Sequence, residues 1–491
     1  MTVKLSLASL GSLPANVAAP AYRPGDISAG IVHFGVGNFH RAHQAVYLDD
    51  LFARGTDKDW GILGVGVFAS ERDGRDRLAN QDWLSTVVEQ DASGRKARVT
   101  GAMTGYVMPG EPSATIEALS SPAIRIVSLT ITEGGYFIDP ASGAFNPDHP
   151  DIVADARHPD QPTTVFGLML AALARRKHTG VPPFTVMSCD NIPHNGRVTA
   201  DALGGLAALT DSDLARWIEQ EVAFPNGMVD RITPATTARE RAILAQEFGV
   251  EDAWPVFCEP FRQWVLEDRF TAGRPRLEEV GVQFVPDVAP FEQMKIRILN
   301  GGHAAIAYPA GLLDIHFVHE AMEEPLVRAF LRKIEQDEIM PTVPPVPDTD
   351  LDDYFALIVD RFSNPAIGDT VRRLCLDGSN RQPKFIVPTI VDRLAQGRSI
   401  DGLALESALW CRYCFGTTES GKMIEPNDPN WDRLVAAARK ARVEPRIWLG
   451  MDDIYGEVGR SETFSAAFAS ALDSLWNTGT RETLIRYLHQ P

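Results

Sequence analysis

The sequence predicts an α/β protein, with a doubly wound parallel sheet in its first part and a mainly α-helical domain in its second. In the first part, apolar runs of strand length alternate with helical patterns, and in the second part strand signals almost disappear. At 491 residues the chain is also too long for one compact core. We expect one domain over residues 1–287, with insertions in it, and a second over residues 288–491.

The predicted strands of the first part are apolar along their whole length. They cover residues 30–37, 60–68, 123–132 and 184–189. Helical patterns lie between them, at 40–54 after the first strand and at 163–176 before the last. Strands that are buried on both faces are typical of parallel sheets covered by helices on each side. This order of elements predicts a doubly wound sheet.

Helical patterns dominate the chain after residue 287. Breaks rich in proline, glycine and aspartate separate them, such as PTVPPVPDTD at 341–350. The predicted helices cover residues 292–307, 325–338, 351–361, 365–376, 401–415 and 461–490. The sequence therefore predicts a mainly helical second domain.

The charge of the chain narrows its possible partners. Lys and Arg total 47 and Asp and Glu total 65, which gives a formal net charge of −18. Such a chain repels nucleic-acid phosphates and anionic lipid surfaces. No apolar run approaches the ~20 residues that span a bilayer. We expect no nucleic-acid or membrane partner, and the same charge favours a neutral substrate over an acidic one.

The cysteines and the N-terminus indicate a cytoplasmic location. The five cysteines are odd in number and mostly scattered, which fits a reduced cytosolic protein. The N-terminal segment lacks the order of charged, apolar and cleavage-site parts that marks a secretory signal.

A glycine-rich turn, Gly35-Val36-Gly37-Asn38-Phe39-His40, joins the first predicted strand to the following helix. Glycines there permit a tight turn and let backbone N–H groups approach a pyrophosphate, which the helix N-terminus also attracts. His40 stands where the usual fingerprint has its third glycine. The turn predicts dinucleotide binding, and the predicted cofactor residues at this turn are Gly35, Gly37, Asn38, Phe39, His40 and Arg41.

An acidic residue follows the second predicted strand. We expect Glu71 to bind the adenosine ribose, with Asp73 as the second choice. A carboxylate at this place bonds the 2′-hydroxyl and repels a 2′-phosphate, which favours NAD. Ser70 and Arg72 are residues that an NADP pocket uses, so NADP use stays open.

Residues 292–308, EQMKIRILNGGHAAIAY, place a lysine, an asparagine and a histidine on one predicted helix. At ~100° per residue, Lys295, His303 and Asn300 fall at about 0°, 80° and 140°, within one broad face. Each glycine of the pair after Asn300 costs about 1 kcal/mol relative to alanine. A fold tolerates this cost where the backbone passes close to another group, and a bound cofactor or substrate would be such a group. The alternative is a surface lysine, a capping asparagine and a core histidine.

Two further polar clusters lie among apolar residues of the first part. Ser188-Cys189-Asp190-Asn191 ends the run at 184–189, at the sheet edge where open α/β proteins bind ligands. The stretch FPNGMVDRITP at 224–234 holds Asp230 in an apolar frame. Alcohol oxidation requires a base for the hydroxyl proton and donors for the developing alkoxide. A lysine and two asparagine amides meet that requirement.

Several blocks of the chain together resemble one family. They read FGVGNFHRAH, SLTITEGGYF, SCDNIPHNG, FPNGMVDRITP, EPFRQWVLED and MKIRILNGGHAAIAY. In this order they resemble the polyol-specific long-chain dehydrogenases/reductases over nearly the whole chain, and the nearest likeness is to members that act on mannitol. The resemblance implies a Rossmann-type N-terminal domain, a helical C-terminal domain, a cleft between them and catalysis without zinc.

The resemblance also implies a reaction. Hydride would pass between NAD(H) and C2 of a sugar alcohol and its ketose, with D-mannitol and D-fructose as the expected pair and a monomer as the expected assembly. Lys295 would be the general acid/base, and Asn191 and Asn300 would flank the reacting oxygen.

Five other residues receive roles from the same resemblance. His303 would orient the substrate hydroxyl, Asp230 would hold polar groups of the site, and Glu292 would exchange the lysine proton with solvent. Arg373 and Lys384 would contact the polyol chain. The chain departs from the family pattern at NGGH, where NGSH is expected, and at Ser70-Glu71, where paired acids are common.

Other functions stay open. A zinc enzyme could use His40-Arg41-Ala42-His43 or Cys411-Arg412-Tyr413-Cys414, although neither has a second matching pair nearby. A related enzyme could act on sorbitol or arabinitol. Another could reduce fructuronate or tagaturonate, with Arg373 and Lys384 as the carboxylate site. A non-catalytic NAD-binding sensor would have no need of the lysine base.

Overall fold

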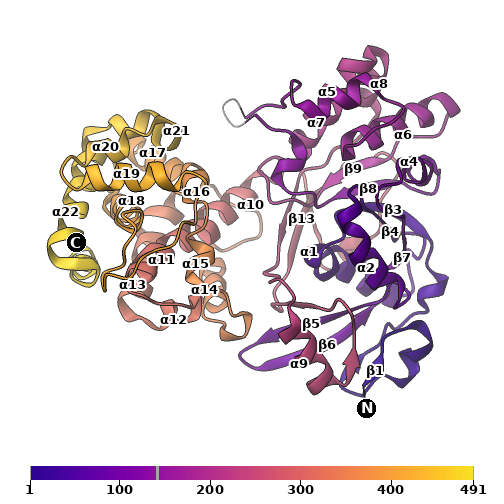
Figure 1. Ribbon diagram of the computed structural model, residues 1–491, viewed down its shortest axis with the longest axis horizontal. Helices are drawn as coiled ribbons and strands as arrows, with labels where there is room; N and C mark the ends of the chain where they lie inside the picture. The colour runs from indigo at the N-terminus through magenta and orange to yellow at the C-terminus, as the bar shows by residue number, and fades with distance from the viewer. Residues whose placement is uncertain (1, 140–142, 490–491) are drawn as a thin grey trace. The chain divides into compact units, whose positions relative to one another are not determined.

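The computed structural model describes residues 2–139 and 143–489, and Figure 1 shows its helices and strands. The chain divides into two compact units, Met1–Val288 and Ala289–Pro491, here called unit 1 and unit 2. Unit 1 combines parallel and antiparallel sheets with helices, and unit 2 is built from helices.

The core of unit 1 is a five-stranded parallel sheet in the order β7-β4-β3-β8-β9. Its strands are β7 (Met103–Tyr106), β4 (Gly61–Val65), β3 (Ala29–Phe34), β8 (Ile126–Leu129) and β9 (Thr185–Ser188). The four apolar runs supply β3, β4, β8 and β9, which confirms the predicted parallel sheet. The chain passes from β3 to β4 on one side and later to β8 on the other, so the strand order reverses at β3.

The first helix of unit 1 is shorter and more broken than predicted. The pattern at 40–54 forms α1 (Asn38–Ala42) and α2 (Gln44–Ala53). They meet at His43, whose backbone leaves the helical region at φ −117° and ψ −88°. The helix that follows the glycine turn, α1, is therefore only five residues long.

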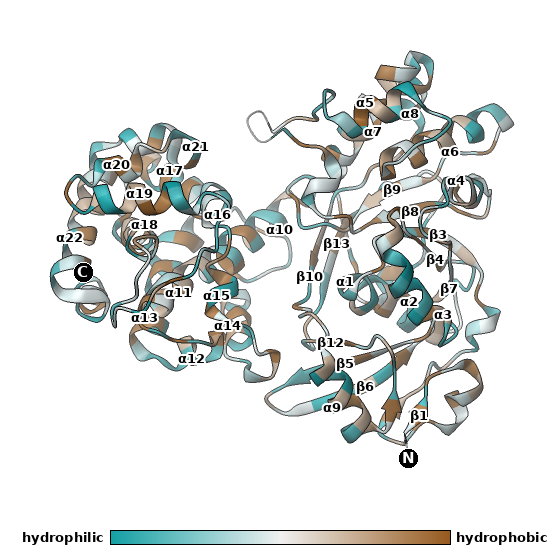
Figure 2. Ribbon diagram, in the orientation of Figure 1, coloured by the Kyte–Doolittle hydropathy of each residue, from teal (hydrophilic) through white to brown (hydrophobic). Residues whose placement is uncertain are grey.

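Helix α6 (Val165–Thr179) covers the sheet where a helix is predicted. The Thr164 hydroxyl caps its N-terminus by accepting from the Gly167 N–H, and Gly180 ends it in the left-handed region. It packs against α4 (Pro112–Ser120) and α7 (Asn195–Thr210). Figure 2 shows the apolar character of β8 and β9, whose residues are all buried.

Besides one two-stranded parallel sheet, two further sheets complete unit 1. Strands β5 (Ser85–Asp91) and β6 (Gly94–Thr100) form an antiparallel hairpin in the sheet β12-β5-β6-β2. Strands β10 (Gly227–Asp230), β13 (Gln263–Glu267) and β14 (Gln283–Val285) form the other, which carries Asp230 at one strand end. The remaining elements are β1 (Val3–Lys4), β2 (Val17–Ala18), α3 (Arg72–Ala79), α5 (Pro150–Arg157), α8 (Ser212–Glu221), α9 (Ala238–Phe248), β11 (Val250–Glu251) and β12 (Val256–Cys258).

Helix α18 (Asp401–Tyr413) forms the centre of unit 2, and its residues from 402 to 413 are all buried. It packs against the helices α11 and α22 of the same unit. The helices of unit 2 are α10 (Ala289–Met294), α11 (Gly301–Leu312), α12 (Val318–Glu323), α13 (Pro325–Ile334), α14 (Leu351–Phe362), α15 (Val371–Leu374), α16 (Gly378–Phe385), α17 (Val387–Ala395), α18 (Asp401–Tyr413), α19 (Trp431–Ala441), α20 (Arg446–Leu449), α21 (Asp452–Tyr455) and α22 (Glu462–Leu488). This confirms the predicted helical second part. In the part of the chain that the structure describes, no helix is both long enough and apolar enough to cross a membrane.

Two predicted helices of unit 2 differ from the prediction because glycines interrupt them. The pattern at 365–376 forms only a short 3-10 turn and α15, separated at Gly368 with φ +64°. The pattern at 461–490 forms α22, which bends at Gly479 with φ +82°. The last residue of that prediction lies outside the described residues.

Candidate active site

The glycine turn lies at the carboxyl end of β3, where the strand order reverses. Gly35 has φ +89°, and a Cβ there would lie 2.0 Å from the Thr130 carbonyl oxygen, so only glycine fits. The Thr130 hydroxyl donates to the Gly35 carbonyl at 2.7 Å. A Cβ on Gly37 would meet only a carbonyl oxygen at 3.8 Å, so the backbone there is open. An open glycine turn at a switch point is where such sheets bind dinucleotide phosphates.

The side chains of His40 and Arg41 lie inside unit 1 instead of lining an open surface. Arg41 is fully buried, and its acceptors are the Gly37 and Trp254 carbonyls, the Asn38 amide oxygen and the Ser85 hydroxyl. Its guanidinium also lies 4.0 Å from the centre of the Trp254 ring. The His40 ring stacks on His33, with 3.7 Å between centroids. These two side chains support the turn from inside unit 1, and their assignment as cofactor-binding residues stays a prediction.

Asn38 and Phe39 connect the turn to neighbouring segments. The Asn38 amide donates to the Pro234 carbonyl at 3.2 Å, close to the stretch that contains Asp230. The Phe39 ring stacks on His43 at 4.8 Å. Burial lowers the pKa of His43 to about 3, so its imidazole is neutral.

Glu71 lies just after β4, as predicted. One of its carboxylate oxygens accepts from the Val67 and Phe68 N–H groups, each at 2.8 Å. These two bonds fix the carboxylate against the turn at the end of the strand. Asp73, the second choice, is exposed and pairs with Arg77 at 2.6 Å.

Asn191 follows β9 in a loop that Asp190 holds in place. The Asp190 carboxylate accepts from the Ile131 and Thr132 N–H groups, at 2.9 and 3.0 Å, and from the Tyr136 hydroxyl at 2.7 Å. Asp190 thereby joins the loop after β9 to the loop after β8. The sequence alone gives Asp190 no role of its own, because its partners lie more than fifty residues away along the chain.

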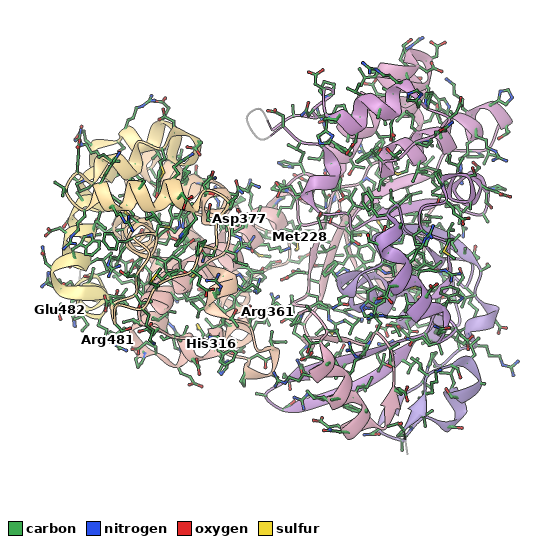
Figure 3. The ribbon with its side chains drawn as sticks, viewed as in Figure 1. Met228, His316, Arg361, Asp377, Arg481 and Glu482 are labelled. Atoms are coloured by element: carbon green, nitrogen blue, oxygen red, sulfur yellow. The ribbon has the colours of Figure 1, made fainter. Side chains whose placement is uncertain are left out.

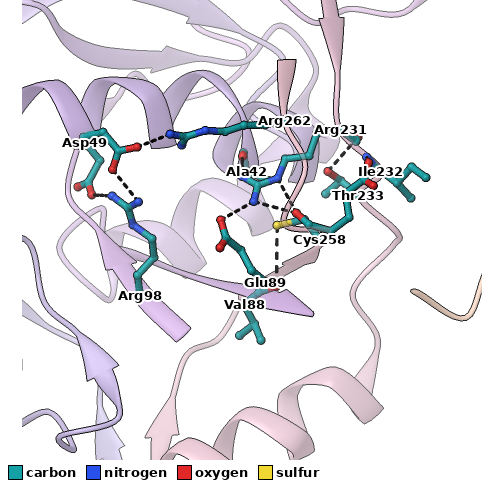
Figure 4. A network of polar contacts seen from close by, with 12 residues as sticks. Ala42, Asp49, Val88, Glu89, Arg98, Arg231, Ile232, Thr233, Cys258 and Arg262 are labelled. Atoms are coloured by element: carbon teal, nitrogen blue, oxygen red, sulfur yellow. Dashed lines mark hydrogen bonds and ion pairs between the residues drawn. The ribbon is translucent and has the colours of Figure 1, made fainter. Parts of the chain in front are cut away.

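Asp230 ends β10 and is buried. Figure 3 labels Met228, two residues earlier on the same strand. The next residue, Arg231, has a fully buried side chain that anchors this strand end. Its guanidinium donates to the Ala42 carbonyl at 2.5 Å and to the Glu89 carboxylate at 2.6 Å (Figure 4). The position of Asp230 is therefore fixed by a buried network.

The segment predicted as one helix over 292–307 contains a π-helical turn, Lys295–Asn300, between α10 and α11. The Gly301 N–H donates to the Ile296 carbonyl, five residues back. The angles expected for a regular α-helix therefore do not apply here, and Lys295 and Asn300 lie about one wide turn apart. Their exposed fractions are 7% and 9%. Glu292, one turn before the lysine, is also buried.

The second glycine after Asn300, Gly302, lies close to side chains of unit 2. A Cβ on Gly302 would lie 3.2 Å from Glu335 Oε1 and 3.4 Å from atoms of Leu331 and Phe362. The close approach at Gly302 is therefore to side chains of the same unit.

His303 lies one turn of α11 beyond Asn300. Its ring stacks on Phe362, with 4.4 Å between centroids. Burial lowers the pKa of His303 well below its usual value, and the charges of Arg373, Arg361 and Arg381 lower it further. The imidazole is therefore neutral and lies among three arginines.

One of the three arginines near His303 is predicted from the sequence, and the other two are not. Arg373 is the predicted one, and it forms a forked ion pair with Asp369. Lys384 is exposed on α16, and Arg381 lies one turn earlier on the same helix, where it donates to the Leu374 carbonyl at 3.1 Å. Arg361 lies on α14 (Figure 3) and is buried. No motif marks Arg361 or Arg381, so only the structure brings them to His303.

The two candidate zinc motifs lie in the interior of the units. His40 and His43 are buried in unit 1, and Cys411 and Cys414 are free, buried thiols in unit 2. Burial raises the pKa of both thiols well above their usual value. Within residues 2–139 and 143–489, no group of three or more His, Cys, Asp or Glu side chains is arranged to hold a metal ion.

The chain matches one family along most of its length. Residues 29–279 match the mannitol dehydrogenase Rossmann domain, and residues 287–476 match the mannitol dehydrogenase C-terminal domain. It is 60% identical over 474 residues to mannitol 2-dehydrogenase of Cereibacter sphaeroides, covering 96% of this chain and 99% of that one. It is 42% identical over 480 residues to mannitol 2-dehydrogenase of Aspergillus oryzae, covering 96% of each.

Solved structures share the fold over the same length. The Pseudomonas fluorescens mannitol 2-dehydrogenase, in a ternary complex with NAD and D-mannitol, superposes with a TM-score of 0.89 at 46% identity over 100% of both chains. A D-sorbitol dehydrogenase in substrate-free form superposes with a TM-score of 0.90 at 36% identity, over 98% of this chain and 100% of that one. The chain therefore belongs to the mannitol dehydrogenase family.

Proposed function

We propose that this chain is an NAD-dependent polyol dehydrogenase that interconverts D-mannitol and D-fructose by hydride transfer at C2, with Lys295 as general acid/base and without zinc. The observation that supports this most is the buried π-helical turn that carries Lys295 and Asn300, with neutral His303 one helical turn further on. π-Turns are rare, and they occur frequently at functional sites. The Pseudomonas fluorescens relative, which binds NAD and D-mannitol, supports the choice of cofactor and substrate.

The residues around the glycine turn fit NAD. The tight turn at Gly35 and the open backbone at Gly37 suit a pyrophosphate, and the fixed carboxylate of Glu71 suits a ribose 2′-hydroxyl. Arg72, the candidate for a 2′-phosphate, already donates through Nε to the Pro109 carbonyl at 3.1 Å. Held by Gly35, Gly37 and Glu71, NAD would supply the hydride acceptor for C2. We expect a preference for NAD over NADP.

Lys295 takes the proton of the C2 hydroxyl as general base and returns it in the reverse reaction. The amides of Asn191 and Asn300 donate to the same oxygen as negative charge develops on it. As the hydride leaves C2, the C2–O bond becomes a carbonyl. Glu292, three residues before Lys295, exchanges the lysine proton with solvent.

His303, Asp230, Arg373 and Lys384 position the substrate. A neutral imidazole has one donor and one acceptor nitrogen, so His303 can orient a hydroxyl group that itself donates and accepts. Asp230, at its anchored strand end, holds polar groups of the site. Arg373 and Lys384 donate to hydroxyls along the polyol chain.

The first experiment compares NADH and NADPH oxidation with D-fructose. We expect faster turnover with NADH, and activity that EDTA does not reduce. Loss of activity with EDTA that zinc restores would contradict the lysine mechanism as a sufficient one. No turnover of D-fructose with either cofactor would overturn the proposed substrate pair.

A second candidate substrate comes from the D-sorbitol dehydrogenase with the same fold. Sorbitol and mannitol differ in hydroxyl configuration, and small displacements of polar groups distinguish such isomers. Oxidation of D-mannitol, D-sorbitol and D-arabinitol at equal concentrations ranks the three. Faster oxidation of D-sorbitol would assign the chain to that activity.

We also propose that the protein is a cytoplasmic monomer. The five buried, free cysteines support a reducing compartment. Light scattering after gel filtration tests the subunit number, and a dimer mass would contradict it.

A further inference from the structure

Arg373 is held from one side by a carboxylate of its own segment. Asp369 accepts from Arg373 Nε and from a terminal nitrogen, in a forked ion pair between residues four apart. Asp369 also accepts the Thr370 N–H at 2.9 Å. The exposed fractions of the two side chains are 11% for Asp369 and 48% for Arg373. The carboxylate is therefore the fixed inner partner, and the guanidinium is the accessible one.

This ion pair lies in the surroundings of His303. Helix α15, which carries Arg373, packs against α11, which carries His303. The Cys375 thiol, directly after α15, donates to the Ala307 carbonyl of α11 at 3.5 Å. After burial, Arg373 is the largest of the influences that lower the pKa of His303. The accessible part of Arg373 thus lies in the same part of unit 2 as His303, the residue proposed to orient the substrate.

The fork between Asp369 and Arg373 limits what else this arginine can bind. Arginine holds a carboxylate best through two parallel N–H groups along one edge of the guanidinium. Asp369 occupies the edge formed by Nε and one terminal nitrogen, which leaves the edge between the two terminal nitrogens, and its negative charge offsets the positive charge of the guanidinium. A carboxylate of a substrate would meet the negative charge of Asp369 through the same small group. A neutral hydroxyl can accept from the remaining N–H groups without that repulsion.

We propose that Asp369 is a specificity-determining residue, which restricts Arg373 to uncharged polyols and ketoses and thereby excludes hexuronates. This inference rests on the proposed function, since it requires Arg373 to contact the substrate chain. The hexuronate activity that the sequence leaves open would require the loss of this carboxylate.

The test is the variant Asp369→Asn, which keeps a side-chain oxygen for the Thr370 N–H but removes the charge. The ratio of kcat/KM for D-fructuronate to that for D-fructose is measured with NADH in the wild type and the variant. We expect the ratio to rise about tenfold or more in the variant, because a repulsive element is removed. An unchanged ratio would overturn the inference.

The control is Asp453→Asn, which removes the carboxylate of another ion pair in unit 2, where one terminal nitrogen of Arg433 donates to both carboxylate oxygens. We expect its ratio to equal that of the wild type. Wild-type protein that fails to reduce D-fructose would overturn the proposed function itself, which is a different result from an unchanged ratio.

A second measurement does not depend on the folding of the variant. D-mannonate, which carries a carboxylate, and D-mannitol are compared as ligands of the wild-type protein loaded with NADH. We expect D-mannonate to bind about tenfold more weakly or worse. Equal affinity would overturn the role of Asp369.

Discussion

The guanidinium of Arg231 donates to the Ala42 carbonyl at 2.5 Å, which joins the strand that carries Asp230 to the helix that begins at the glycine turn. The same side chain donates to the Glu259 carbonyl at 3.0 Å and to the Glu89 carboxylate at 2.6 Å. Figure 4 shows this network around a single buried guanidinium. One arginine thus holds both a proposed cofactor element and a proposed substrate residue.

Arg231→Met should destabilise unit 1 and weaken cofactor binding together. The change leaves two carbonyls and a carboxylate without their donor, and hydrogen bonds to charged groups contribute about 1.5–3 kcal/mol each. We expect a loss of about 3 kcal/mol or more in urea unfolding, a higher KM for NAD and a lower kcat. Arg433→Met, on the exposed surface of unit 2, should change stability by less than about 0.5 kcal/mol. Lower stability with an unchanged KM for NAD would show that the arginine has only a structural role.

Lys295→Ala should abolish most of the turnover while NAD binding remains. A positioned general base contributes about 10²- to 10⁴-fold in rate, and alanine cannot take the proton. The checks are kcat with D-mannitol and NAD affinity by fluorescence titration. Lys333→Ala, which removes a half-buried partner of Asp337, is the control and should leave kcat unchanged. Near-normal turnover from about pH 6 to about pH 10 would contradict the role of the lysine.

Asn300→Ala should reduce transition-state stabilisation and leave substrate binding largely intact. Loss of one donor to a developing oxyanion costs about 2.7–4 kcal/mol, which corresponds to about 10²- to 10³-fold in kcat. The comparison is kcat and KM for D-mannitol in the variant and in the exposed-site control Asn477→Ala. A change confined to KM would make Asn300 a group that binds substrate and transition state equally.

The parallel sheet could be predicted because burial on both faces leaves a continuous apolar run. Strands β3, β4, β8 and β9 all carry this pattern. The hairpin of β5 and β6 could not be found in this way, because β6 reads GRKARVT and its first three residues are exposed or half-buried. Such short, partly polar strands depend on their partners more than on their own sequence.

The sequence predicts those residues of the candidate site that belong to one motif. It does not predict those that come together only through tertiary contacts. Lys295 and Asn300 share one segment, so the sequence pairs them, but the π-turn between them leaves no mark in the hydrophobic pattern. The partners of Asp190 and the acid beside Gly302 come from distant segments. Contacts between such segments follow from packing, which a single sequence does not display.

The acid beside Gly302 predicts how stability depends on pH. Glu335 is fully buried, and within the described residues neither of its carboxyl oxygens has a hydrogen-bond partner. Burial raises its pKa well above the ordinary value of 4.5, so the folded protein keeps this carboxyl protonated where the unfolded chain ionises it.

Glu335→Gln should therefore be more stable than the wild type at about pH 8, and the difference should shrink toward about pH 5. The folded state binds one proton more than the unfolded state, so wild-type stability falls by about 1.4 kcal/mol for each pH unit above 4.5, until the raised folded pKa is reached. Glutamine has nearly the same shape and cannot ionise, which removes this loss. Urea unfolding at several pH values measures the difference, with the exposed-site variant Glu444→Gln as control. A difference that stays constant with pH would mean that Glu335 is ionised in the folded protein.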